Sequence, residues 1–417
     1  MPSVTSPAGD CSGAAAILRS RRAARATLHA PSRRRWESPI TTTALEIHGS
    51  CDERFGAVRD AFAANFDDHD EVGASVAVTI DGRSVIDLWA GHADDDRTRP
   101  WERETIVNIW SSTKGFVTLA AHMLADRGEL DFDVPVTRYW PEFGQAGKAT
   151  LPVRYLLTHQ AGLNRIEAEL PPAAAFDWDA QIHALEQQPP LWTPGTRHGY
   201  HTGTFGHLVG ELIRRISGRS VGAFIREEIS EPLGIDFLLG FGPEEDHRVA
   251  DVLDPRVEPD PDAPVQIPRG IANTRGWRQA EIPAGNGHSN ARALAKFYGA
   301  LALGGEIDGV RLLSAEQVSR SAQLVASGHD ETLGVASHRT LGFMRPFPEL
   351  GDVRPASSFG HAGAGGSQGF ADPDRRLGFG YAMNQMYTPR PGGDALPSGG
   401  MDPRGQRLVA ALYDALG

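Results

Sequence analysis

Residues 73–91 read GASVAVTIDGRSVIDLWAG, two runs of β-branched and apolar residues on either side of Asp81-Gly82. An Asp-Gly pair accepts the positive φ angles of a tight hairpin turn, so this stretch predicts a β-hairpin. A second pair of apolar runs flanks a turn at residues 372–376, within HAGAGGSQGFADPDRRLGFGYAMNQM at 361–386. The two predicted hairpins lie near opposite ends of the chain.

Helical patterns fill most of the sequence between the hairpins. Apolar residues recur at helical spacing from Phe116 to Leu124, and Gly128 supplies a left-handed C-cap. Further helices are predicted over residues 204–218, 291–303 and 407–416. Residues 240–285 are rich in proline and acidic residues, which predicts a long surface loop. We therefore expect an α+β fold, with an antiparallel sheet built from both ends of the chain, flanking helices and a mostly helical insertion.

The N-terminal tail differs in composition from the rest. The first 36 residues hold seven arginines and one acid, Asp10, and are rich in alanine and serine. We expect a disordered tail over residues 1–44, with a transit peptide as the alternative. One catalytic domain is expected over 45–417. Its α/β part comprises about 45–130 and 290–417, and its helical and loop part about 131–289.

Net charge and cysteine content exclude several classes of function. The chain carries −12 in total and +6 in the first 36 residues, so the remainder carries −18. Such an acidic body repels phosphate backbones, which disfavours nucleic-acid binding. No apolar run of about 18 residues is present to span a membrane. Cys11 and Cys51 form neither a CxxC pair nor a Cys/His cluster, which predicts no disulfide framework, no structural zinc and a cytoplasmic location.

Ser111-Ser112-Thr113-Lys114 forms an S-x-x-K sequence at the start of a predicted helix. Side chains three residues apart share a helix face, so the amine can reach the hydroxyl. A neutral Lys114 can take the proton of Ser111, provided that its pKa falls from ~10.4 toward 7, a change of roughly 4–5 kcal/mol. Lysine is scarce here, since 38 of the 41 basic residues are arginine. The alternative for Ser111 is an ordinary helix N-cap.

Four blocks carry a family resemblance: WSSTKGF at 110–116, LLTHQAGL at 156–163, PGTRHGYHTGTFGHLVGELIRRISG at 194–218 and FGHAGAGG at 359–366. In this order they resemble the serine β-lactamase and penicillin-binding-protein-like superfamily, in particular its family VIII carboxylesterase-like members. The resemblance runs from about residue 46 to the C-terminus and implies the serine β-lactamase-like fold. It implies Ser111 as nucleophile with Lys114 and Tyr200 as its activating pair. It also implies His361, Gly363 and Ala364 as substrate-binding and oxyanion residues, the backbone N–H of Ala364 being the second oxyanion donor.

The resemblance implies hydrolysis of small carboxylic esters through an acyl-enzyme on Ser111, without a metal or organic cofactor. Two departures favour neutral esters over penicillins. Tyr200-His201-Thr202 stands where the family often has Y-x-N or Y-x-S, and His361-Ala362-Gly363 replaces a K-T-G that carries a permanent cation. Three alternatives stay open: a β-lactamase, a D-amino-acid peptidase, and a catalytically inactive scaffold. Oligomeric state and natural substrate do not follow from the sequence.

Three other motifs offer alternative candidates for a functional site. Gly365–Gly369 matches the G-x-S-x-G nucleophile elbow of α/β-hydrolases, but no histidine follows His361 to complete a triad around Ser367. Ser289, before the helix at 291, is predicted to be a helix cap. His198 and His201 have metal-ligand spacing, with His207 nearby, but no partner carboxylate stands at a fixed spacing, so a metal site is disfavoured.

Overall fold

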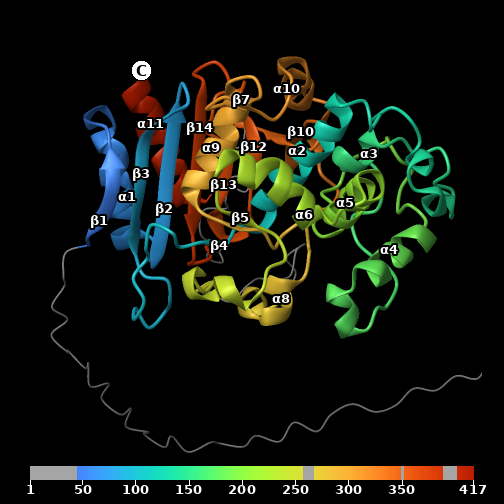
Figure 1. The fold of residues 1–417 in the computed structure, drawn as a ribbon, viewed down its shortest axis with the longest axis horizontal. Helices are drawn as coiled ribbons and strands as arrows, with labels where there is room; N and C mark the ends of the chain where they lie inside the picture. Colours follow the sequence, from blue (N-terminus) through green and yellow to red (C-terminus); the bar gives the residue numbers. More distant parts are fainter. Residues whose placement is uncertain (1–44, 257–266, 349–351, 388–401) are drawn as a thin grey trace, which may run out of the picture. The chain divides into compact units, whose positions relative to one another are not determined.

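A nine-stranded antiparallel sheet organises the protein, and its strands come from both ends of the chain (Figure 1). The computed structural model describes residues 45–256, 267–348, 352–387 and 402–417, and the tail predicted over 1–44 lies outside them. Residues Leu45–Gly417 form one compact unit. The strand order is β1-β3-β2-β14-β13-β12-β11-β10-β9. The predicted α+β fold class is confirmed.

Both predicted hairpins are present. Asp81 and Gly82 adopt φ angles of 51° and 78° between β2 and β3, and residues 373–376 connect β13 to β14. Strand β2 pairs with β14, with Val78 opposite Phe379, and this pairing joins the two ends of the chain. The strands of the sheet are β1 (Ile47–Cys51), β2 (Gly73–Ile80), β3 (Arg83–Gly91), β9 (Ala326–His329), β10 (Ala336–Arg339), β11 (Met344–Arg345), β12 (Phe359–Ala362), β13 (Gln368–Asp372) and β14 (Leu377–Met383).

Helices cover both faces of the sheet. On one face, α1 (Gly56–Asp68) and α11 (Pro403–Leu416) pack their apolar residues onto β2, β3 and β14. On the other face lies α9 (Ala291–Ala302), in contact with β2, β13 and β14 (Figure 1). Gly378 and Gly380 permit this close approach, because a Cβ at either position would lie 2.2 Å from a carbonyl oxygen of α9.

Most of the α-helices lie in the segment between the hairpins. Its helices are α2 (Thr113–Asp126), α3 (Arg154–Leu157), α4 (Trp178–Gln187), α5 (Thr204–Ser217), α6 (Val221–Ile225), α7 (Glu231–Leu233) and α8 (Arg275–Gln279), with α10 (Ala315–Ala322) following α9. Two small sheets accompany them: β4 (Val107–Asn108), β5 (Phe237–Leu238) and β6 (His288–Ser289), and β7 (Glu306–Ile307) with β8 (Val310–Arg311). None of the helices in the described ranges has the length and apolar character to cross a bilayer.

Three sequence expectations need correction. Residues 240–285 are not simply a surface loop, because the segment contains α8 and several buried residues, among them Ala272 and Ala284. Ser289 does not cap α9; the Asn290 side chain does, by accepting the N–H of Ala293 at 2.9 Å. Helix α11 begins at Pro403 rather than 407, since proline suits the first helical position and the Asp402 carboxylate caps the turn.

Candidate active site

Ser111 lies in a tight turn between β4 and α2. The turn, Trp110–Ser112, is a short 3-10 helix, and Trp110 adopts a φ of 46°, a left-handed conformation rare for a bulky residue. The position of the turn is fixed by hydrogen bonds to the Ile109 carbonyl, which accepts the Ser112 N–H at 3.1 Å and the Ser367 hydroxyl at 2.7 Å. Strained backbone of this kind clusters at functional sites. Ser111 lines a large cavity.

Lys114 is fully buried one turn after Ser111. Its Nζ lies 2.9 Å from Ser111 Oγ, 2.8 Å from the Thr202 carbonyl oxygen and 2.7 Å from the Ala284 carbonyl oxygen. No carboxylate contacts the amine in the described ranges. Burial, reinforced by the positive charge of Arg339, places the pKa of Lys114 well below its ordinary value. The site therefore favours a neutral amine beside the serine.

Tyr200 completes the group. It lies in the loop before α5, its side chain is close to that of Ser111, and its ring centre is 4.8 Å from Lys114 Nζ. Burial raises the pKa of Tyr200 to about 12, although the interaction with Ser111 and the charge of Arg339 oppose the shift. The phenol is thus protonated at neutral pH. The structure brings Ser111, Lys114 and Tyr200 together, while their chemical roles stay predictions.

The turn after β12, which we call the glycine loop (Gly363–Gly366), faces the Ser111 turn. A Cβ on Gly363 would lie 2.3 Å from the Ile109 carbonyl oxygen and 3.1 Å from the Ser111 nitrogen, so only glycine fits there. Ala364 begins a short 3-10 helix and lines the cavity. Ala364 and Ser111 therefore line the same cavity, an arrangement that suits an oxyanion hole formed by their N–H groups.

His361 occupies a different position from the other predicted substrate-binding residues. The side chain is buried, and its Nδ1 lies 2.8 Å from the Ala362 carbonyl oxygen. Burial, followed by the charge of Lys114, holds the pKa of His361 well below its ordinary value, so the ring is neutral. Residues 362–366 line the cavity, whereas the neighbouring His361 does not. A direct substrate contact for His361 stays a prediction.

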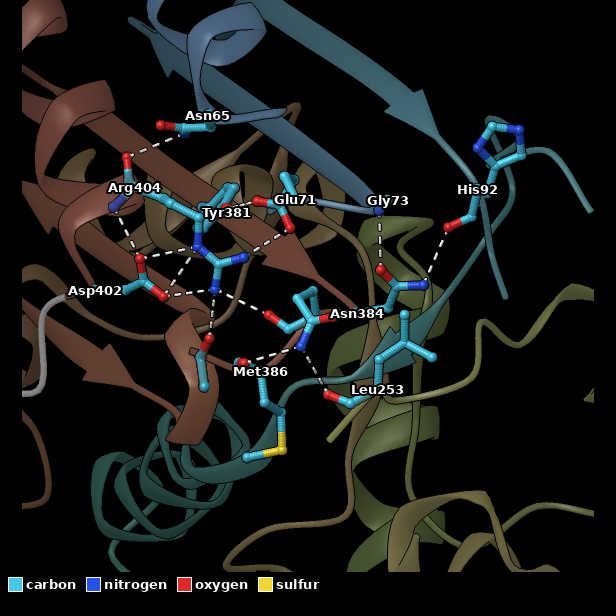
Figure 2. A network of polar contacts seen from close by, with 12 residues as sticks. Asn65, Glu71, Gly73, His92, Leu253, Tyr381, Asn384, Met386, Asp402 and Arg404 are labelled. Carbon is cyan, nitrogen blue, oxygen red and sulfur yellow. Dashed lines mark hydrogen bonds and ion pairs between the residues drawn. The ribbon is translucent and has the colours of Figure 1, made fainter. Parts of the chain in front are cut away.

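A buried ionic network anchors the glycine loop from the side of α11. Figure 2 shows Arg404 with its carboxylate partners Asp402 and Glu71, at 2.6 and 2.8 Å. The same guanidinium donates to the Gly365 carbonyl at 2.8 Å, and Tyr381 donates to Glu71. One arginine thus connects the start of α11 to the loop that carries Ala364.

Two functional candidates escaped the sequence analysis. Asp330, in the turn between β9 and β10, accepts the Tyr200 N–H at 2.8 Å. Arg339, at the end of β10, forms a buried ion pair with Asp330 at 2.9 Å and lies 4.8 Å from the Tyr200 ring centre. No motif marks either residue, because Asp330 follows Tyr200 by 130 positions and only the fold unites them.

Ser367 and His201, which belong to the competing motifs, make structural hydrogen bonds. Ser367 is fully buried, and its hydroxyl donates to Ile109 rather than facing the cavity. His201 uses both ring nitrogens, accepting the Leu163 N–H at 3.2 Å and contacting the Gly199 carbonyl at 2.6 Å. Within the described ranges, no cluster of three or more His, Cys, Asp or Glu residues is arranged to hold a metal ion.

The cavity above Ser111 has a volume of about 1000 Å³. This is at the upper end of the range for small-molecule sites. Its wall is largely apolar, and the segment expected to be a surface loop contributes a substantial part of it. The main apolar and aromatic side chains are Trp110, Ile166, Phe176, Ile267, Ile271, Trp277, Ile282, Leu333, Met344 and Tyr387.

Known proteins resemble this chain over most of its length. A family model described as Beta-lactamase matches residues 58–398. Esterase/beta-lactamase LipL of Mycobacterium tuberculosis is 37% identical over 375 residues, which cover 82% of this chain and 84% of LipL. The crystal structure of a family VIII carboxylesterase has 42% identity and a TM-score of 0.81, covering 89% of this chain and 100% of that one. A penicillin-binding protein homologue from Caulobacter crescentus has 40% identity and a TM-score of 0.80, with coverage of 89% and 100%.

These similarities confirm the superfamily, the fold and the enzyme class that the sequence blocks predicted. In the fold, the S-x-x-K turn, the loop of Tyr200 and the glycine loop line one cavity. The chain belongs to the β-lactamase family.

Proposed function

We propose that the protein hydrolyses neutral carboxylic esters through an acyl-enzyme on Ser111. The observation that carries this proposal is the set of three contacts around Lys114 Nζ, two to backbone carbonyls and one to Ser111 Oγ. A neutral amine has two N–H groups and one lone pair. In the charged form Nζ donates all three hydrogen bonds, including the one to Ser111 Oγ. In the neutral form both N–H groups are donated to the Thr202 and Ala284 carbonyls, and the lone pair is left to accept the Ser111 proton.

The first half of the reaction forms the acyl-enzyme. Ser111 Oγ attacks the ester carbonyl carbon while its proton passes to Lys114 Nζ. The N–H groups of Ser111 and Ala364 stabilise the negative oxygen of the tetrahedral intermediate. As the intermediate collapses, the carbon–oxygen bond to the leaving alkoxide breaks. The proton on Lys114 reaches that alkoxide through the Tyr200 hydroxyl, and the alcohol departs.

Water then hydrolyses the acyl-enzyme. The same pair accepts a proton from water as its oxygen attacks the acyl carbon, and the bond to Ser111 Oγ breaks. Ser111 recovers its proton and the carboxylic acid leaves. Tyr200 relays protons in its neutral form, because its pKa of about 12 leaves little phenolate at neutral pH. No step requires a metal ion or an organic cofactor.

The cavity supports neutral substrates. Its wall is rich in apolar side chains, and the two arginines that line it among the described residues, Arg165 and Arg339, are paired with Glu167 and Asp330. His361 is neutral and buried, so it supplies no fixed charge for a substrate carboxylate. A weaker β-lactamase activity is the second candidate, since acylation is common to both reactions and the relative LipL is named an esterase/β-lactamase. A cytoplasmic location forms part of the proposal and rests on the scarcity of cysteine, with Cys51 unpaired.

A substrate panel with a covalent probe tests this function. We expect hydrolysis of p-nitrophenyl esters, slower or no hydrolysis of a chromogenic cephalosporin, and labelling of Ser111 by a fluorophosphonate, located by peptide mass spectrometry. Ser111→Ala should abolish both turnover and labelling, and a strong chelator should leave turnover unchanged. Labelling of another residue, or hydrolysis of the cephalosporin alone, would overturn the proposal.

A further inference from the structure

Tyr200 is held at two points by a single buried ion pair. Its backbone N–H donates to Asp330 Oδ1 at 2.8 Å, and its ring lies against the Arg339 guanidinium, with 4.8 Å between the guanidinium carbon and the ring centre. Arg339 Nη2 donates to Asp330 Oδ2 at 2.9 Å, which closes the arrangement. The loop that carries the phenol is thus connected to strand β10.

The Asp330 carboxylate is itself rigidly placed. Besides Tyr200, its Oδ1 accepts the N–H groups of Thr332 and Leu333, both at 3.0 Å, and its Oδ2 accepts the Ser337 hydroxyl at 3.2 Å. Burial opposes ionisation, but the charge of Arg339 and these donors hold the pKa of Asp330 below its ordinary value. The carboxylate therefore stays charged and keeps the arginine in one orientation.

Stability alone does not account for this pair. Both side chains are at most 1% exposed, and Arg339 Nε and Nη1 make no hydrogen bond within the described part of the chain. A buried guanidinium with unsatisfied donors is costly, and apolar residues of similar volume often replace buried ion pairs at no loss of stability. The cost is understandable if the charge beside Tyr200 serves the reaction.

We propose that Arg339 and Asp330 form a clamp that aligns the Tyr200 phenol on Ser111 and supplies the fixed positive charge of the site. This inference rests on the proposed function of the Ser111 site. Arg339 and Asp330 are positioning residues, since they act through Tyr200 and Lys114 rather than on the substrate.

The neighbours of Arg339 are themselves buried. In the described part of the chain, the titratable groups near the Tyr200 ring include Lys114 and the histidines His159, His201 and His361, and His198 contacts Ser337 beside Asp330. Burial lowers the pKa of all five groups. Among the causes of the lowered pKa of Lys114, the charge of Arg339 follows burial. A permanent cation at this position favours the neutral amine and opposes the raised pKa of Tyr200. Removing it should move the titrations of both groups to higher pH.

The three lysines of the chain make a direct measurement possible. Lysine labelled with ¹³C at Cε gives one signal each for Lys114, Lys148 and Lys296, and Lys114→Met and Lys296→Arg assign them. In Arg339→Met the Lys114 signal should titrate at higher pH than in the wild type, while the Lys148 signal stays in place. Arg339→Lys, which keeps a charge but loses the two-pronged contact, should leave the Lys114 titration nearer that of the wild type.

Arg354→Met is a matched control. Arg354 also forms a buried pair with an aspartate, Asp352, and lies over an aromatic ring, yet it is absent from the charges that act on Lys114 and Tyr200. We expect Arg339→Met to lower kcat by about 10- to 100-fold and to move the acidic limb of the kcat/KM profile to higher pH. Arg339→Lys should lower kcat without moving that limb.

The inference fails if the Lys114 signal titrates at the same pH in Arg339→Met as in the wild type, or if Arg354→Met produces the same losses. Circular dichroism identifies any variant that does not fold, and in that case the comparison of Arg339→Lys with the wild type decides. Failure of the proposed function gives a different result: the wild-type protein then neither hydrolyses esters nor reacts at Ser111. The Lys114 titration reports on the charge of Arg339 whether or not the protein is an esterase.

Discussion

The Ser367 hydroxyl donates a 2.7 Å hydrogen bond to the carbonyl oxygen of Ile109. This bond joins the start of β13 to the residue two positions before Ser111, and Ser112 Oγ lies 3.3 Å from the same hydroxyl. The serine of the G-x-S-x-G sequence therefore supports the turn of a different serine. Its burial leaves it no access to substrate.

Ser367→Ala should consequently reduce stability and spare the chemistry. Removing the donor leaves the Ile109 carbonyl with a single partner, the Ser112 N–H, at a cost of about 1–2 kcal/mol. Thermal denaturation measures the loss, and fluorophosphonate labelling of Ser111 should persist. Complete loss of labelling with an intact fold would contradict this supporting role.

Ala364→Pro isolates one proposed oxyanion donor. Ala364 is the first residue of its 3-10 helix, preceded by an extended Gly363, and proline is well accommodated at a first helical position. The substitution removes one N–H and little else, so kcat should fall by about 100- to 1000-fold. Ala364→Ser retains the N–H and serves as the control. Equal rates for the two variants would exclude this N–H from the oxyanion hole.

The sequence predicted the parts of the site that depend on local geometry. Ser111 and Lys114 share a helix face because of their three-residue spacing, and Asp81-Gly82 produces a hairpin turn with little help from the rest of the chain. The Asp330–Arg339 pair was not predictable, because its link to Tyr200 depends on tertiary packing. The cap of α9 illustrates a narrower failure, since Ser289 and Asn290 have similar capping propensities and pairing of β6 engages Ser289.

Trp277 should influence the size of the acyl group that the enzyme accepts. Its ring lies 5.6 Å from that of Trp110 and 6.5 Å from that of Phe176, so three aromatic rings extend from the Ser111 turn to the protein surface. In Trp277→Ala, kcat/KM for a p-nitrophenyl octanoate should fall by about 10- to 100-fold relative to the acetate. Trp89→Ala, outside this cavity, is the control. An unchanged octanoate-to-acetate ratio would place the acyl chain elsewhere.

Glu71 should make stability depend on pH. Burial raises the pKa of Glu71 to about 7, against an ordinary value of 4.5, despite the opposing charge of Arg404. Between these values the folded state binds more protons than the unfolded state, so this group's stabilising contribution is complete below pH 4.5 and is lost as pH rises toward 7.

The variant Glu71→Gln lacks this titration. Relative to it, the wild type should lose stability between pH 4.5 and 7, by an amount of order 3 kcal/mol. Chemical denaturation across this range measures the difference. Parallel stability curves for the two proteins would show that Glu71 does not change its protonation state.

Arg404→Met should lower the free energy of unfolding by about 3–5 kcal/mol, because it leaves two buried carboxylates without their cation.

Lys114 links the pH dependence of activity to that of stability. The amine accepts a proton only when neutral, so kcat/KM should rise with pH through the lowered pKa of Lys114. Lys114→Met and Lys114→Arg should both lose activity by about 1000-fold or more, since neither side chain can accept the Ser111 proton. Between the folded and unfolded pKa values the unfolded state binds more protons, so wild-type stability should rise with pH relative to Lys114→Met. An active Lys114→Arg enzyme, or a pH-independent stability difference, would mean that this lysine stays charged and that another group takes the proton.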